Sequence, residues 1–140
     1  MSSMAKRTEA YVDTSALIAF ADRSDSYHDL FRRAFGDPPP LVTTPLVVAE
    51  GHAWFLKRFD SFRALAFISM IEAMQPLRIV SFAKREQKAA VAVLRKFSDQ
   101  RLTLTDAAGI SLMRIRRIRS CWSTDFHLGL TGVPLIIHGI

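Results

Sequence analysis

The chain has 140 residues, 49% of them hydrophobic, so it is long enough to bury one sizeable core and fits a single domain. No apolar run reaches the ~18 residues of a membrane span, and the single cysteine excludes both an intramolecular disulfide and a cysteine-based zinc site. The formal net charge of +6 indicates a polyanionic partner, either nucleic acid or an acidic protein, although an inert basic surface has the same composition.

The first eight residues lack the apolar segment of a signal peptide. We therefore expect residues 1–8 to form a flexible tail and residues 9–140 to form one domain. A single cysteine and no targeting segment favour a cytoplasmic protein without a membrane partner.

In chain order, an apolar strand at residues 11–13 leads into a helix at 14–21, and a polar break separates that helix from the next one. The three prolines that follow Gly36 end the second helix, because proline cannot continue it. Strands separated by helical segments of ten or more residues predict an α/β fold with a mostly parallel sheet of four to five strands. The later elements that we predict are helices at 27–35, 44–58, 61–74, 84–97 and 103–119, and strands at 41–43, 77–81, 121–123 and 134–137.

An aspartate lies at, or shortly after, the end of two predicted strands. Asp13 follows the first strand and Asp125 follows the fourth, and in open parallel sheets ligands bind outside the carboxyl ends of the strands. Each acid also has a purely structural interpretation. Asp13 can cap the helix that follows it, and Asp125 can begin the turn before the short segment 126–130.

Two further acids lie on predicted helices. Glu50 shares a helical face with apolar residues three and four positions away, so it is either desolvated and paired or placed at the edge of that face in solvent. Asp106 has capping-box spacing with Thr103, yet it is also in line with the apolar residues Ile110 and Met113. Local evidence leaves both interpretations of each acid open.

All four acids could face one mouth of the sheet. Carboxylates in one place repel and raise one another's pKa values unless cations neutralise them. Oxygen-only ligands favour Mg²⁺ or Mn²⁺, which activate water and stabilise a phosphate during transfer. This hypothesis explains an acidic pocket on a basic protein, because the basic surface would bind a phosphate backbone and the metal would neutralise the pocket.

Four short motifs occur in order, namely Val12-Asp13-Thr14-Ser15-Ala16-Leu17, Val48-Ala49-Glu50, Leu102-Thr103-Leu104-Thr105-Asp106-Ala107 and Ser123-Thr124-Asp125-Phe126-His127. With them the chain resembles the PIN-domain ribonucleases, most closely their VapC-type toxin branch, from Tyr11 to about Ile137. The resemblance implies a three-layer α/β/α sandwich and Mg²⁺- or Mn²⁺-dependent endonucleolytic cleavage of RNA.

The resemblance also implies roles for particular residues. Position by position, the acidic quartet that would bind the metal and carry catalysis is Asp13, Glu50, Asp106 and Asp125. His127 stands where some members of the family have another acid or an amide, which leaves the number of firmly held metals open. The residues expected to support the metal or its waters are Thr14, Ser15, Asp99, Thr105 and His127.

The end of the predicted helix at 103–119 is rich in arginine. Contact with RNA and simple compensation of the helix dipole explain this equally well. The candidate RNA-binding residues are Arg114, Arg116, Arg117 and Arg119.

The helices at 44–58 and 61–74 are unusually apolar, which indicates a protein interface in addition to core packing. The resemblance implies a homodimer that binds an antitoxin protein. The sequence leaves open which of these two contacts the helices make.

Our hypothesis from the sequence is a metal-dependent endoribonuclease, the toxin of a toxin–antitoxin pair, that leaves a 5′-phosphate and a 3′-hydroxyl, as the resemblance implies. The first alternative is a module of the same fold that binds RNA or protein without turnover. The second is an aspartyl-phosphate enzyme or receiver domain, which usually needs another acid beside the strand-end aspartate. Here Thr14 and Ser15 follow Asp13 instead.

Overall fold

The computed structural model describes residues 8–138, and a four-stranded parallel sheet lies at their centre. The strands lie in the order β3-β2-β1-β4, and Tyr11 of β1 is opposite Val42 on one side and Cys121 on the other. The predicted α/β class and parallel sheet are confirmed. The strands are β1 (Ala10–Val12), β2 (Leu41–Thr43), β3 (Leu77–Ile79) and β4 (Cys121–Trp122).

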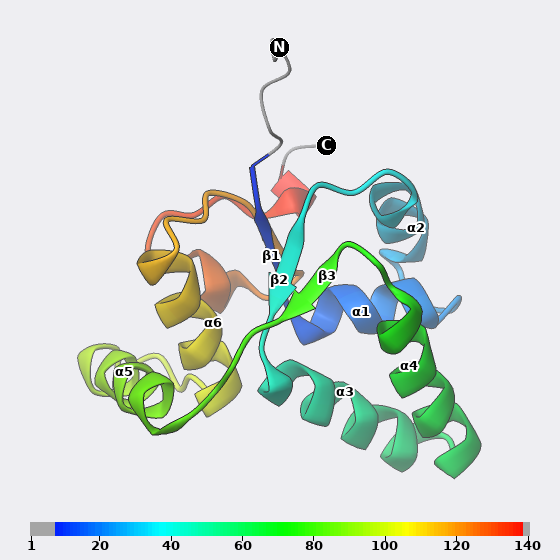
Figure 1. Cartoon of the computed structure of the whole chain (residues 1–140), viewed down its shortest axis with the longest axis horizontal. Helices are drawn as coiled ribbons and strands as arrows, with labels where there is room; N and C mark the ends of the chain where they lie inside the picture. The colour runs from blue at the N-terminus through cyan, green and yellow to red at the C-terminus, as the bar shows by residue number, and fades with distance from the viewer. Residues whose placement is uncertain (1–7, 139–140) are drawn as a thin grey trace, which may run out of the picture.

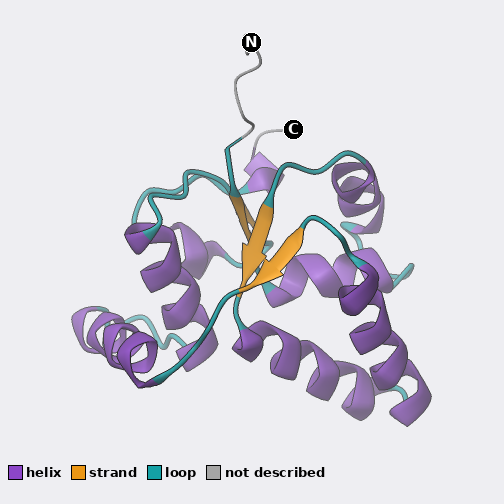
Figure 2. Cartoon of the chain, in the orientation of Figure 1, coloured by secondary structure: helices purple, strands orange, loops and turns teal. Residues whose placement is uncertain are grey.

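Helices cover both faces of the sheet, with α1 to α4 on one side and α5 and α6 on the other (Figures 1 and 2). The chain moves from β1 to β2 to β3 in one direction and then returns past β1 to β4, so right-handed crossovers place the last two helices on the opposite face. The result is the three-layer α/β/α sandwich that we predicted. The helices are α1 (Thr14–Ala21), α2 (His28–Gly36), α3 (Pro45–Arg58), α4 (Ser61–Ala73), α5 (Lys84–Lys96) and α6 (Leu104–Ile115).

The neighbouring strands β1 and β4 form the switch point of the sheet, because the connections from β1 to β2 and from β3 to β4 run on opposite faces. Ligands of open α/β sheets bind in the crevice at such a point. Asp13 leaves β1 there, and its backbone N–H donates to the Trp122 carbonyl at 3.0 Å. The topology thus holds the ends of two strands distant in sequence side by side.

Tight packing holds α6 against β1. Tyr11 is fully buried, and a Cβ atom at Gly109 of α6 would lie only 2.5 Å from its hydroxyl oxygen. Glycine is therefore required at this close approach. The contact fixes where the first turn of α6 lies relative to the carboxyl end of β1.

Three helices begin as the sequence indicates. Pro45 occupies the first turn of α3, where a backbone N–H would have no partner within the helix, so the N–H that proline lacks is not needed. The Asp60 carboxylate accepts a hydrogen bond from the Arg63 N–H at 2.8 Å at the start of α4. The Thr103 hydroxyl accepts from the Asp106 N–H at 3.1 Å at the start of α6.

Two predictions near the C-terminus are wrong. The helix predicted at 103–119 ends at Ile115, because Arg117 adopts a left-handed conformation with φ 55° and the Ile118 N–H bonds back to the Met113 carbonyl at 2.8 Å. The fifth strand predicted at 134–137 is reduced to a single bridge between Leu135 and Cys121. After that bridge the His138 N–H bonds to the Leu135 carbonyl, and the chain turns into a short 3₁₀ helix.

Other boundaries differ by one or a few residues, and the strand predicted at 77–81 ends at Ile79. The segment after Asp125 forms a 3₁₀ helix, Phe126–Gly129. Of the predicted tail at 1–8, all but Thr8 lies outside the described residues. Among residues 8–138, none of the helices has both the length and the apolar character needed to cross a bilayer.

Candidate active site

A cleft of about 370 Å³ lies where β1 and β4 end, and all four predicted acids line it. They come from four separate places in the chain, namely the end of β1, the middle of α3, the first turn of α6 and the loop after β4. The structure therefore brings together side chains that are up to 112 positions apart, Asp13 and Asp125 being the extremes. The acids of the cleft are Asp13, Glu50, Asp106 and Asp125.

Asp13 is the most deeply buried of these acids, with 4% of its surface exposed. Although it is the N-cap residue of α1, its side chain makes no capping hydrogen bond. Its Oδ2 instead accepts from the hydroxyls of Ser15 at 3.0 Å and Ser123 at 2.9 Å. Burial raises the pKa of Asp13 to about 6, and the two hydroxyl bonds act in the opposite direction.

Asp106 serves the fold and lines the cleft at once. Its Oδ2 accepts from the Thr103 N–H at 3.1 Å, so the capping box inferred from the sequence is present. Burial raises its pKa, and the negative charges of Asp125 and Glu50 add to the effect. Asp106 therefore caps α6 and at the same time belongs to the group of acids that line the cleft.

Asp125 likewise combines both of the interpretations that the sequence left open. Its Oδ1 accepts from the His127 N–H at 3.0 Å and caps the short helix that follows. The Nδ1 atom of His127 lies 3.1 Å from the same oxygen. One ligand atom each from Asp106, Asp125 and His127 lie within 4.8 Å of one another, a grouping that can hold a metal ion.

Glu50 is exposed, which fits the edge-of-face interpretation rather than a desolvated acid. It nevertheless lines the cleft and contributes to the raised pKa of Asp106. An exposed carboxylate at the rim of a buried acidic floor can reach toward a ligand or its waters at low desolvation cost.

Two hydroxyl residues expected near the acids do lie in the cleft. The Ser15 hydroxyl is 3.2 Å from the Ser123 hydroxyl and accepts from the Thr124 N–H at 3.0 Å, which ties α1 to the loop after β4. Thr14 is buried, and its Oγ1 has no hydrogen-bond partner within residues 8–138. A buried hydroxyl without a partner calls for a water or an ion, because leaving it unpaired costs free energy.

The sequence model of the PIN domain matches residues 10–128. The chain belongs to the PIN-domain family. The match runs from β1 into the short helix that follows Asp125, so it includes every acid of the cleft.

Individual relatives of this PIN domain are distant. Ribonuclease VapC26 of Mycobacterium tuberculosis is 28% identical over 115 residues, which cover 81% of this chain and 84% of that protein. The crystal structure of Mycobacterium tuberculosis VapC20, described as a sarcin-ricin loop cleaving toxin, superposes with a TM-score of 0.81 at 21% identity over 89% and 96% of the two chains. A toxin–antitoxin complex from Klebsiella pneumoniae has a TM-score of 0.61 at 16% identity, covering 91% and 95%.

Other predicted residues of the PIN domain lie outside the acidic cleft. Asp99 is exposed in the loop before α6 and accepts from the Gln100 side chain at 3.3 Å, and Thr105 is half-buried in the first turn of α6 without lining the cleft. Arg116 forms a two-pronged ion pair with Glu9, with N–O distances of 2.9 and 2.7 Å.

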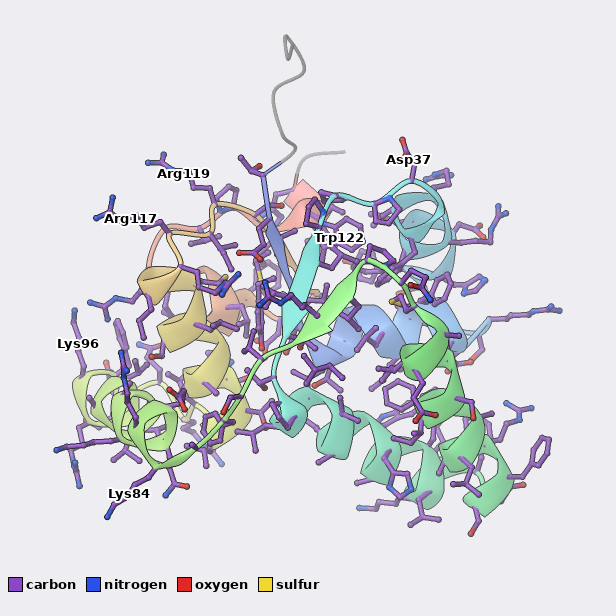
Figure 3. The ribbon with its side chains drawn as sticks, in the orientation of Figure 1. Asp37, Lys84, Lys96, Arg117, Arg119 and Trp122 are labelled. Atoms are coloured by element: carbon purple, nitrogen blue, oxygen red, sulfur yellow. The ribbon has the colours of Figure 1, made fainter. Side chains whose placement is uncertain are left out.

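The remaining predicted arginines lie at the far end of α6. Figure 3 shows Arg117 and Arg119 beside the amino ends of the strands, with their side chains pointing outwards. With Arg114 and Lys96 they line a separate hollow of about 640 Å³. The structure therefore does not bring these cations to the acids.

No role was predicted from the sequence for several residues that shape the cleft or hold its acids. Ser123 is fully buried and bonds to Asp13, and although it begins the fourth sequence motif, no role was assigned to it. Trp54 and Lys57 line the cleft from α3. They lie four and seven positions after Glu50, a spacing that places all three on one helical face and could have identified them.

Proposed function

We propose that this PIN domain is a metal-dependent endoribonuclease and the toxin of a type II toxin–antitoxin pair. The observation that carries the proposal is the convergence of Asp13, Glu50, Asp106 and Asp125 in one cleft at the switch point of the sheet. Similarity to a ribonuclease and to a toxin that cleaves the sarcin-ricin loop supports the same activity.

The donor atoms in the cleft fit a hard divalent cation. Carboxylate oxygens dominate, and Asp106, Asp125 and His127 offer clustered ligand atoms. The Thr14 hydroxyl has no hydrogen-bond partner in the part of the chain that the structure describes. Mg²⁺ or Mn²⁺ would be held by Asp13, Asp106 and Asp125, with Glu50 direct or through water. Such an ion supplies a Lewis acid for a scissile phosphate and for the attacking water.

The protein's own residues would orient the reactants. Ser15 and Ser123 hold the Asp13 carboxylate in one rotamer through their shared bonds to Oδ2. His127 is fixed beside Asp125, and Glu50 projects from α3 at the rim. Carboxylates fixed in this way would position a water for in-line attack, and the cleaved strand would keep a 5′-phosphate and a 3′-hydroxyl.

We further propose that a longer RNA reaches the arginines at the far end of α6. Arg114, Arg117 and Arg119 are exposed around one hollow, whereas Arg116 is already paired with Glu9. No salt bridge within residues 8–138 engages these three guanidinium groups, and exposed guanidinium groups of this kind suit phosphate contacts. Since its substrate is RNA, we expect the protein to act in the cytoplasm.

An exposed apolar surface on α3 and α4 is an argument for partner proteins. Phe55, Phe67 and Ile71 are buried as core residues, but a second set on these helices and in the turn between them is exposed. We propose that this surface joins two copies in a homodimer or binds the antitoxin. The exposed set is Leu56 (46%), Phe59 (41%), Phe62 (77%) and Leu65 (62%).

The decisive experiment is RNA cleavage by the purified protein with Mg²⁺, with Mn²⁺ and with EDTA. We expect wild type to cleave only with metal, and Asp13→Asn and Asp106→Asn to lose roughly a thousandfold in rate, as when members of a catalytic unit are removed. Asp29→Asn is the matched control, because Asp29 is an exposed acid on α2 whose contact is with Arg32. Equal rates for wild type and the two cleft variants would overturn the proposal.

A further inference from the structure

The acidic cleft continues outwards along α3. Glu50, Trp54 and Lys57 all line it, and their spacing of four and three residues puts them on one face of that helix. At about 1.5 Å per residue, Lys57 lies about 10 Å further along the helix than Glu50. The wall of the cleft thus changes along its length from acidic to aromatic to cationic.

Trp54 is held as a rigid platform at this wall. Its indole makes T-shaped contacts with Phe55 at 4.9 Å and with Phe59 at 6.2 Å between ring centroids. The Arg58 guanidinium carbon lies 5.5 Å from the ring. The side chain is only half-buried, so neighbouring rings fix it while part of its surface faces the cleft.

Lys57 is the one cation among the described residues that line the cleft. It is exposed, and within residues 8–138 no salt bridge engages its ammonium group. Glu50 lies about 10 Å away along α3, and solvent and salt screen the attraction between exposed charges at such a spacing. An exposed, unpaired ammonium beside an aromatic surface is better suited to a phosphate on a bound ligand.

We propose that Trp54 and Lys57 form a nucleotide subsite for single-stranded RNA beside the catalytic acids. The indole stacks on one base, and the Lys57 ammonium binds an adjacent phosphate. Unpaired RNA is required, because a base inside a duplex does not present its face to a side chain. This inference rests on the proposed ribonuclease function and names the form of RNA that the cleft accepts.

Binding to fluorescently labelled RNA tests the subsite, with Asp13→Asn as the common background to prevent cleavage. The probes are a mixed-sequence single-stranded RNA, the same RNA in a duplex, and a ribose-phosphate strand without bases. We expect Trp54→Ala to weaken binding of the base-bearing strand roughly five- to hundredfold, since a base–aromatic stack contributes about 1–3 kcal/mol. Trp54→Phe restores most of the affinity, and neither variant changes binding of the strand without bases.

Lys57 is tested by salt dependence. Lys57→Ala should lower the slope of log affinity against log salt by about 0.7, the value for one phosphate contact on a single strand. Lys57→Arg keeps the slope. The matched control is Lys88→Ala, which removes an exposed cation on α5 that does not line the cleft. This control should leave the salt slope unchanged.

Three results overturn the subsite while leaving the nuclease intact. They are wild-type affinity in Trp54→Ala, an equal loss for strands with and without bases, and tighter binding to duplex than to single strands. A thermal melt of each variant accompanies the titration, and Trp54→Phe distinguishes lost stacking from lost packing. Absence of metal-dependent cleavage by wild type would instead count against the proposed function.

Discussion

The two ends of α6 differ in almost every physical respect. Its first turn holds Asp106, an acid 8% exposed, hydrogen-bonded to the backbone and coupled to the charges of two other acids. Its last turn carries Arg114 into a cluster of exposed cations around a separate hollow. About 12 Å of helix separates the two residues. Charge that the fold buries and fixes is confined to the acidic end, whereas the charge of the basic end is solvated.

The contrast indicates different roles for the two ends, catalysis at the acidic end and attraction of RNA at the basic end. Buried carboxylates are costly and persist only where bonds or ions offset the cost, so their positions are constrained. Exposed arginines cost the fold little free energy, and they can contribute to RNA binding from many positions. We therefore expect large, position-specific effects at the acidic end and small, additive effects at the basic end.

The largest of the effects that follow contrasts an acid in the cleft, Asp125, with an acid outside it, Asp99. Asp125→Asn should reduce RNA cleavage by roughly a hundredfold or more, because it removes a charged ligand while the amide oxygen can still accept from the His127 N–H. Asp99→Asn, in the exposed loop before α6, should retain wild-type cleavage. Initial rates at saturating Mg²⁺ measure both. A loss in Asp99→Asn as large as that in Asp125→Asn would show that the cleft alone does not define the site.

The places of the acids in the fold could be predicted from the sequence because their signals were local, while their roles stay predictions. Asp13 and Asp125 follow apolar strands, and Asp106 follows a capping threonine, so each position could be assigned from a few neighbours. What could not be predicted were contacts across the chain. The Ser123 hydroxyl bonds to a carboxylate 110 positions away, and no periodicity reports such a pair.

The position at which α6 ends was mispredicted for a related reason. Helical periodicity allowed α6 to continue to Arg119, but a left-handed residue at Arg117 ends it earlier. A helix end of this kind usually carries glycine, so an arginine there gave no stop signal. The fifth strand failed because Leu135 forms only one bridge before the chain turns. Within residues 8–138, the other four predicted strands and all six predicted helices are present, with ends that differ from the prediction by up to a few residues.

A second prediction concerns the cost of the buried acid. Because burial raises the pKa of Asp13 from 3.8 to about 6, the metal-free fold favours its protonated form. The stability that protonation contributes is present below the unfolded pKa and is lost as pH rises through about 6. At neutral pH, Asp13→Asn should therefore stabilise the metal-free protein by about 1–3 kcal/mol, while this gain vanishes in acid.

Urea unfolding in EDTA, at pH values from below the unfolded pKa of 3.8 up to neutral, measures this effect. Asp29→Asn, an exposed acid on α2, should leave the pH dependence of stability unchanged. Added Mg²⁺ should then stabilise wild type more than Asp13→Asn, because a ligand that binds only the folded state raises its stability. Identical pH profiles for wild type and Asp13→Asn would show that the carboxylate is not destabilised by burial.

The smallest expected effect lies at the basic end and comes from the backbone rather than from charge. Arg117 and Ile118 close α6 through bonds from their N–H groups to the carbonyls of Arg114 at 3.3 Å and Met113 at 2.8 Å. This closure needs a left-handed residue, which costs an L-amino acid free energy that glycine does not incur. Arg117→Gly should raise stability by roughly 0.5–1 kcal/mol, and Arg117→Ala should not, because alanine keeps the Cβ atom.

Thermal melts compare the two variants, and RNA titrations at several salt concentrations accompany them. If Arg117 contacts a phosphate, both variants lower the salt slope equally, since both lack the guanidinium group. Equal stabilisation by glycine and alanine would mean that repulsion among Arg114, Arg117 and Arg119 destabilises this end, and not the backbone. In that case an RNA strand bound there would relieve the repulsion, and the basic end would be coupled to substrate more strongly than exposed charges usually are.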